Sequence, residues 1–154
     1  MLTAKDIMTT DIVSVSPDTE ILKAARLLLE KHFNGLPVLD EKGNLVGIIC
    51  QSDLIAQQKS IPIPTLFTVL DGFIPLKSTK KIESEIRKIA AITVADAMTR
   101  KPVTVRTDTS LEAVASLMVD KNLHTLPVMD EENNLVGILG KEDILKILSR
   151  ESEK

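Results

Sequence analysis

The 154-residue sequence has no tryptophan, no tyrosine, one cysteine and two histidines. A single cysteine cannot form a disulfide within the chain, which excludes a disulfide-stapled secreted fold and favours a reducing compartment. One cysteine and two histidines also cannot supply a zinc cage of Cys/His type, so we expect no metal site. Aromatic residues make up 2% of the chain and the net charge is −3. Because single-stranded nucleic acid is usually held by aromatic side chains over a basic groove, we expect no nucleic-acid partner.

Long apolar runs are also missing. The N-terminal sequence MLTAKDIMTTD lacks the basic start and apolar core of a signal peptide. The most apolar loop-like stretch, residues 61–76, is interrupted by three prolines, an aspartate and a glycine, and it is too short to span a bilayer. These absences predict a cytoplasmic protein that does not insert into membranes.

What the chain does contain is an internal repeat. Apolar residues are 44% and charged residues 27% of the sequence, as in folded globular proteins. Residues 3–55 align with residues 93–145 at a constant offset of 90, without a gap, and 22 of the 53 positions are identical. Chance would give only a few identities, so the repeat indicates a duplication. Features that both copies keep are candidates for a shared fold or a shared site.

Both copies show the same order of patterns. A DxMT segment at residues 6–9 and 96–99 precedes a short alternating run, 13–15 and 103–105, which predicts a strand. A helix follows, with Asp18 or Asp108 expected as N-cap and a possible capping box of Thr109 and Glu112 in the second copy. In the first copy, one helix face carries the apolar residues Ile21, Ala25 and Leu28.

Two apolar runs around a polar turn come next, at 36–40 and 45–49 and again at 126–130 and 135–139, and they predict a hairpin in each copy. A last helix is expected from Ser52 or Lys141. Each copy is therefore a β-α-β-β-α unit of α/β (α+β) class. A unit of about fifty residues is marginal by itself, so we expect the two to share a core.

The predicted domains are a first repeat at 3–55, a connector at 56–92 and a second repeat at 93–150. The connector combines a Pro-rich loop with a helix over residues 80–91, whose charges we interpret as a solvated face.

The duplicated set of DxMT, helix, hPVhD, turn and GhhxxxD (h, apolar) resembles a pair of CBS domains, the domain named after cystathionine β-synthase, also called a Bateman module. The resemblance implies two repeats related by pseudo-twofold symmetry, usually assembled as a homodimer. It implies clefts that bind AMP, ADP, ATP or S-adenosylmethionine, with no other cofactor required. It also implies regulation of an enzyme, transporter or channel, and no catalysis.

Asp53 and Asp143 are the leading site candidates, because each follows a strand-to-helix junction. A helix N-terminus suits a phosphate, and an adjacent carboxylate can accept hydrogen bonds from a ribose diol. In the family, the aspartate at this place has that role. The alternative is that each carboxylate only stabilises its own helix.

The family often has a threonine three residues after the junction glycine, where this chain has Cys50 and Gly140. Both replacements remove a hydroxyl donor and could make the two clefts unequal. The plainer interpretation of Cys50 is a small buried apolar residue, and that of Gly140 is a tight turn. Lys141 adds a cation in the second copy only.

His124 occupies a place where nucleotide-sensing members of the family direct a basic residue at phosphate, and its counterpart is Asn34. Either side chain can donate to phosphate, although only histidine can add charge near neutral pH. The alternative for both is a helix-end role. For His32 we expect only an interaction with the last carbonyls of its helix.

An adenine ring would need an apolar slot. By the resemblance, the slots would be formed by Met8, Val13 and Phe33 in one copy and by Met98, Val103 and Leu123 in the other. Taken singly, each of these residues is better explained as core.

The sequence thus predicts a regulatory, adenine-nucleotide-binding sensor that acts through a partner protein. A ligand-independent dimerisation or interaction module with vestigial clefts is the main alternative. An enzyme is a weaker one, because the chain has no nucleophile with a base signature, no phosphate loop and no metal triad.

Overall fold

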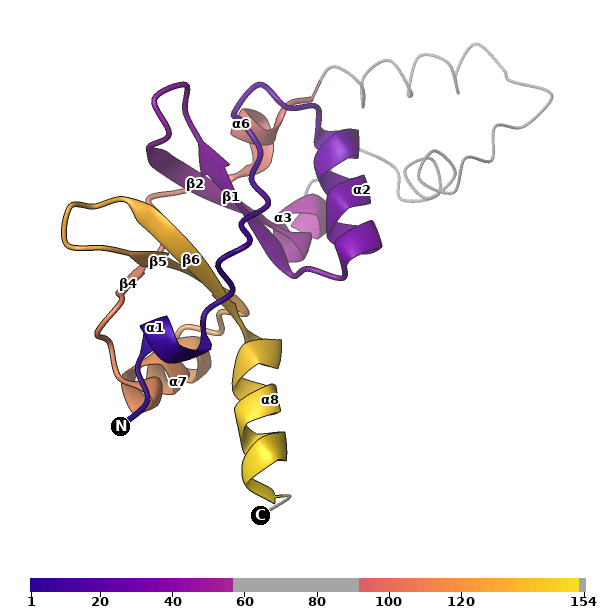
Figure 1. The fold of residues 1–154 in the computed structure, drawn as a ribbon. Coiled ribbons are helices and arrows are strands. Elements are labelled where there is room, and N and C mark those ends of the chain that lie inside the picture. Colours follow the sequence, from indigo (N-terminus) through magenta and orange to yellow (C-terminus); the bar gives the residue numbers. More distant parts are fainter. Residues whose placement is uncertain (57–91, 153–154) are drawn as a thin grey trace, which may run out of the picture.

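The computed structural model describes residues 1–56 and 92–152. They form two similar halves, each with a small β-sheet and covering helices (Figure 1). This arrangement confirms the α/β class expected from the repeat. The predicted connector loop and the helix over residues 80–91 lie outside the described residues.

The order of elements repeats along the chain. In the first copy the elements are α1 (Ala4–Ile7), α2 (Ile21–Lys31), β1 (Gly35–Leu39), β2 (Leu45–Cys50) and α3 (Gln51–Ala56). In the second copy they are α6 (Val94–Ala97), β3 (Thr99–Arg100), β4 (Val105–Arg106), α7 (Leu111–Asp120), β5 (Thr125–Met129), β6 (Leu135–Gly140) and α8 (Lys141–Ser152). The predicted hairpins are the antiparallel pairs β1–β2 and β5–β6.

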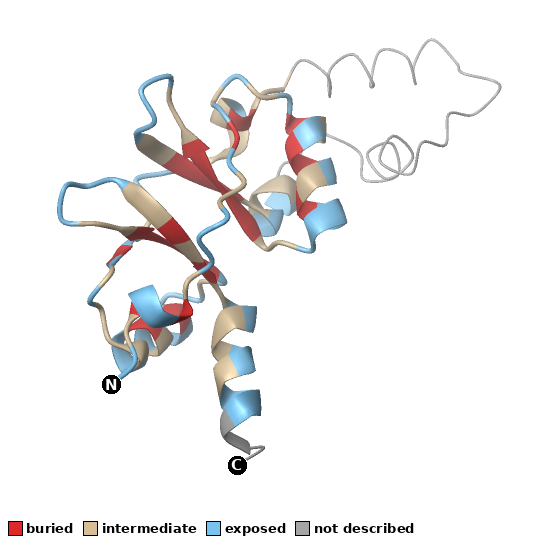
Figure 2. Ribbon diagram, in the orientation of Figure 1, coloured by how far each residue is buried: buried red, intermediate tan, exposed pale blue. Residues whose placement is uncertain are grey.

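The short strand before each long helix pairs in parallel with the hairpin. In the second copy this strand is β4, whose Val105 lies opposite Val128. In the first copy only Val15 makes the corresponding bridge, to Val38. Between these sheets and the long helices, apolar side chains are buried (Figure 2). On α2, residues Ile21 and Leu28 are buried as the helical periodicity predicts.

Each DxMT segment packs against the other copy and not against the repeat to which it belongs in the sequence. Strand β3 belongs to the second copy but pairs with β2 of the first, and Thr9 of the first copy bridges to Ile138 of β6. The side chains of Ala4 and Ile7 are buried in the core of the second half, and Val94 is buried in that of the first. Each hydrophobic core is therefore completed by a segment from the other copy.

The long helices begin later than the sequence predicts. Asp18 and Asp108 are not N-caps, because the caps are Glu20 and Ser110. The Ser110 hydroxyl accepts a hydrogen bond from the Ala113 N–H at 3.2 Å. The predicted capping box at Thr109 is also wrong, since the Thr109 hydroxyl closes the preceding turn by accepting from the Arg106 N–H at 2.9 Å.

Two capping carboxylates lie instead in the DxMT segments. Asp6 accepts from the N–H and the hydroxyl of Thr3 at 2.8 and 3.1 Å, and Asp96 does the same with Thr93 at 2.9 and 3.1 Å. The backbone N–H of Thr3 lowers the pKa of Asp6. These bonds fix the start of each four-residue helix in the folded structure.

No helix within residues 1–56 and 92–152 combines the length and hydropathy needed to cross a membrane. In the same ranges, His, Cys, Asp and Glu side chains form no group of three that could hold a metal ion.

The exchanged segments explain the glycine that both copies keep in the second hairpin strand. A Cβ on Gly137 would overlap the sulfur of Met8 and lie 2.8 Å from its Cγ. A Cβ on Gly47 would lie 2.7 Å from the Met98 sulfur and 2.9 Å from the Thr99 carbonyl oxygen. The methionines therefore pack directly on bare strand backbone.

We expect Gly47→Ala and Gly137→Ala to destabilise the fold by about 1–3 kcal/mol through overpacking, measured by urea unfolding. Gly47→Ala should cost more, because it meets a backbone oxygen as well as a flexible side chain. Gly140→Ala is the matched control, since its Cβ would meet nothing closer than 3.8 Å. Equal stability of all three variants would contradict this account of the packing.

Hairpin turns in both halves are held by one carboxylate. Asp40 accepts from the N–H groups of Lys42 and Asn44 at 2.9 and 2.8 Å, and Asp130 accepts from Glu132 and Asn134 at the same distances. The bonds from Asn44 and Asn134 are the main reason that the pKa of each aspartate is lowered. Each lowered pKa contributes stability that is present above the unfolded-state pKa and is lost as pH falls.

The double variant Asp40→Asn/Asp130→Asn should be less stable than the wild type at pH 7. The difference should shrink as pH falls below about 4, where the carboxylates of the unfolded chain begin to take up protons before those of the folded protein. Thermal unfolding between pH 2.5 and 7 measures this, with Asp120→Asn at the exposed end of α7 as control. A difference that stays constant with pH would refute the role of the charge.

Candidate functional site

The two halves meet where their first hairpin strands begin. A Cβ on Gly35 of β1 would lie 3.2 Å from the hydroxyl oxygen of Thr125 on β5 and 3.0 Å from the sulfur of Cys50. Gly35 and Thr125 are equivalent positions in the repeat, and Thr125 is buried, with 7% of its surface exposed. A small residue is therefore needed on one side of this contact.

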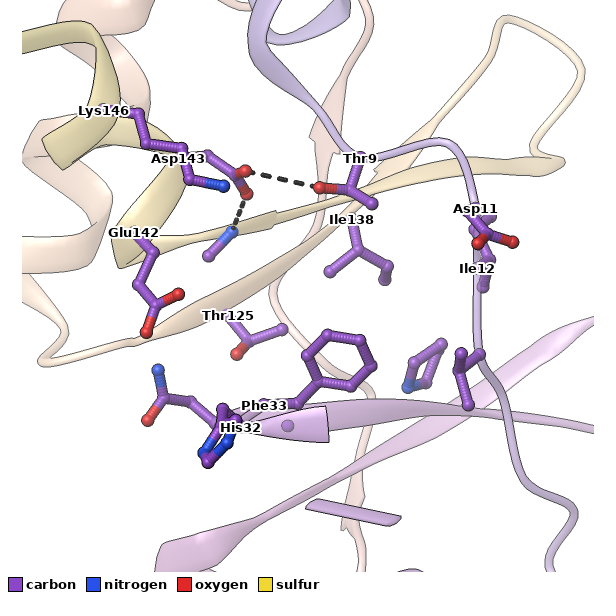
Figure 3. A pocket seen from close by; sticks show the side chains of 15 residues that line it. Thr9, Asp11, Ile12, His32, Phe33, Thr125, Ile138, Glu142, Asp143 and Lys146 are labelled. Atoms are coloured by element: carbon purple, nitrogen blue, oxygen red, sulfur yellow. Dashed lines mark hydrogen bonds between the residues drawn. The ribbon is translucent and has the colours of Figure 1, made fainter. Parts of the chain in front are cut away.

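A cavity of about 130 Å³ opens beside this contact (Figure 3). The first copy contributes the extended segment 9–13 and the end of α2 with residues 32–35. The second copy contributes Thr125, Ile138 and the first turns of α8. Neither repeat could form this cavity alone.

Asp143 lies in the wall of the cavity, half-buried in the first turn of α8. Its carboxylate accepts from the Gly140 N–H at 2.7 Å and from the Thr9 hydroxyl at 3.3 Å. The first bond stabilises the strand-to-helix junction, which agrees with the alternative that this carboxylate stabilises its own helix. The second connects the junction to the exchanged segment of the other copy (Figure 3).

Asp53 has the same surroundings in the other half. It accepts from the Cys50 N–H at 2.7 Å and from the Thr99 hydroxyl at 3.1 Å. The two aspartates therefore occupy separate junctions related by the repeat. The threonine that each aspartate contacts is the last residue of DxMT from the opposite copy, a signal that the repeat alignment contained and that our sequence reasoning missed.

Five predicted site residues line the cavity together: Val13, Phe33, Asn34, Gly140 and Asp143. The ring of Phe33 faces the cavity, with Ile138 across from it (Figure 3). They combine apolar surface with one carboxylate, and they come from both copies.

Other predicted residues are not in this cavity lining. His124 is exposed, and its carbonyl accepts from the Lys141 N–H at 3.1 Å, as the carbonyl of Asn34 accepts from Gln51 at 3.0 Å. Met8, Val103 and Leu123 pack against the core of the second half and Met98 against that of the first, consistent with their plainer interpretation as core.

His32 ends α2 in the left-handed conformation, with φ of 57° and its N–H bonded to Leu28 and Leu29 carbonyls. This confirms the helix-end position expected for it. It also lines the cavity, which the sequence did not predict. The remaining unpredicted polar lining residues are Thr9, Asp11, Thr125, Glu142 and Lys146.

Cys50 is half-buried at the end of β2, against Gly35. Burial, with a smaller effect from Asp53, raises the pKa of its thiol to about 12. The thiol is therefore neutral at physiological pH and poorly nucleophilic, as expected of a small apolar residue.

Because this is the only cysteine, its labelling can be measured directly. We expect an aromatic disulfide reagent at pH 8 to modify native protein at least about 100-fold more slowly than protein in 6 M guanidinium chloride, owing to burial and the scarcity of thiolate. Similar rates in the two conditions would show that Cys50 is an activated thiol.

Comparison with known proteins places the two halves in a family. The CBS domain model matches residues 4–60 and 94–150. The chain therefore belongs to the CBS-domain family and carries a CBS pair, as its repeat predicted.

Among its relatives is MJ1426 of Methanocaldococcus jannaschii, 34% identical over 94% of this chain and 89% of that protein. The chloroplastic CBS domain-containing protein CBSX2 of Arabidopsis thaliana is 35% identical over 90% of this chain and 60% of its own length. The chain also matches inosine-5′-monophosphate dehydrogenase of M. jannaschii at 30% identity, over 93% of this chain but 23% of the enzyme.

Solved structures agree with the fold. CBSX2 in complex with AMP superimposes with a TM-score of 0.73 at 29% identity, covering 99% of both chains. The CBS pair of MJ0100 in complex with 5′-methylthioadenosine and S-adenosylmethionine gives a TM-score of 0.68 at 28% identity, covering 96% of this chain and 99% of that one. Relatives of this chain thus bind adenosine-containing ligands.

Proposed function

We propose that this protein is a regulatory sensor that binds an adenosine-containing ligand in the cavity between its two repeats. The observation that carries the proposal is the lining of that cavity, where an apolar slot and a half-buried carboxylate face one another across the junction of the copies. The ligands seen in the related CBS pairs support the same chemical class.

In this proposal the ribose diol donates to Asp143, which has acceptor capacity beyond its two present bonds. The adenine ring lies among Val13, Phe33 and Ile138, whose aliphatic and aromatic surfaces can replace the missing tryptophan and tyrosine. Asn34 and the backbone near Gly35 can supply hydrogen bonds to the base or its substituents.

The proposed regulatory mechanism follows from the fact that both copies contribute residues to the cavity lining. A ligand that contacts segment 9–13 and α8 at once favours the arrangement in which Thr9 is held against β6 and Asp143. Binding would shift the population toward that arrangement, and a partner protein would respond to it. We propose no catalysis, because the half-buried carboxylates lie at separate junctions and the cysteine is protonated.

A homodimer is the assembly that we propose for this module. Apolar side chains are exposed at equivalent positions of both copies: Leu29 and Val119 on α2 and α7, and Ile55 and Leu145 on α3 and α8. Pairs of exposed apolar residues related by an internal twofold suit a symmetric contact with a second copy. We retain the cytoplasm as the predicted location.

Thermal unfolding with AMP, ADP, ATP and S-adenosylmethionine tests the binding proposal. At a ligand concentration of about 100 times Kd, the fold should be stabilised by about 2.7 kcal/mol. Asp143→Ala should abolish or strongly reduce the shift, since it removes the ribose acceptor.

Two variants serve as controls. Asp53→Ala removes the equivalent junction carboxylate and reports any binding at the other half, and Thr9→Val removes a bond to Asp143 without removing the carboxylate. No shift of the wild type with any of these ligands would favour the interaction module with vestigial clefts. A shift insensitive to Asp143→Ala would refute the site.

A further inference from the structure

The charged groups around the cavity are unevenly distributed. Three carboxylates line it, those of Asp11, Glu142 and Asp143, and one ammonium group, that of Lys146. These four side chains together carry a formal charge of −2. Figure 3 shows Asp11 on the extended segment and Glu142 with Asp143 on α8, on different sides of the opening. A ligand in the slot would therefore meet carboxylates from both copies.

The negative charge is a feature of the Asp143 cavity and is not repeated at the equivalent positions of the other copy. The residues 90 positions away from Asp11, Glu142 and Lys146 are Lys101, Ser52 and Ala56. Of the four charged lining residues, only Asp143 is kept in the other copy, as Asp53. The two junctions thus share the ribose acceptor proposed above and differ in the charges around it.

From this asymmetry we infer that the Asp143 cavity selects an adenosine ligand without a phosphate group, either a neutral nucleoside or one with a positively charged 5′ substituent, and that Asp11 and Glu142 set this preference. The inference rests on the proposed function and names the ligand class for its site.

The physical reason is electrostatic. A phosphate monoester carries close to two negative charges at neutral pH. Asp11 and Glu142 are exposed, so each repels it through a high dielectric and with salt screening, and the joint effect at a separation of several ångströms is about tenfold in affinity. A neutral nucleoside meets no such repulsion, and a sulfonium or ammonium group is attracted.

The cavity supplies its own reporter for the test. Ile138 lines it, so ¹³C labelling of isoleucine δ-methyl groups gives a resonance that responds to ligand at this site, assigned with Ile138→Val. Titrations with adenosine, 5′-methylthioadenosine, S-adenosylmethionine and AMP would yield a Kd for each at the Asp143 cavity, even if the other junction also binds.

In the wild type, we expect AMP to bind about tenfold more weakly at Ile138 than 5′-methylthioadenosine. Asp11→Asn/Glu142→Gln removes two charges and keeps the shape, so it should tighten AMP about tenfold and leave 5′-methylthioadenosine within about twofold. Glu131→Gln/Glu132→Gln in the exposed β5–β6 turn makes the same change in net charge and should leave both affinities unchanged.

AMP binding more tightly than 5′-methylthioadenosine at Ile138, or an AMP affinity unmoved by the Asp11 and Glu142 changes, would overturn the selectivity while leaving the proposed function intact. Absence of an Ile138 shift with all four compounds would remove the proposed function and the selectivity with it.

Discussion

The packing of one copy's methionine on the other copy's glycine is the contact on which the rest of this fold depends. Met8 lies over Gly137 and Met98 over Gly47, closer than any side chain at those positions would allow. Each contact brings a short capped helix with it, so that Ala4 and Ile7 fill one core and Val94 fills the other. Two units of about fifty residues, each marginal alone, thereby become parts of one structure.

The same exchange builds the candidate site. Directly after Met8, Thr9 lies beside Asp143. Residues 11–13 then line the cavity before the chain enters the first half. The cavity therefore lies along a segment that joins the two halves. A ligand bound there, as we propose, would contact the segment that joins the halves, which gives the proposed sensor a physical basis.

Much of the fold could be predicted because its signals are local or are repeated. The hairpins follow from apolar runs around Asp40 and Asp130, the helix faces follow from periodicity, and the duplication follows from a gapless offset. The N-caps were mispredicted because Asp18 and Asp108 fit the local N-cap pattern as well as the observed caps, Glu20 and Ser110, do. Tertiary contacts, in which Ile21 donates to Ile92 and Leu111 to Leu2, decided where each helix begins.

The sequence by itself determined the hairpins, the longer helices, their order, the internal repeat and two candidate carboxylates, because side-chain periodicity, turn residues and duplication are properties of neighbours along the chain. Only the tertiary structure decided that the DxMT segments exchange, that Thr9 and His32 reach the cavity, and that Asp11 and Glu142 share its lining. These residues are more than a hundred positions apart or follow a helix end, and only the packing of one copy against the other brings them together.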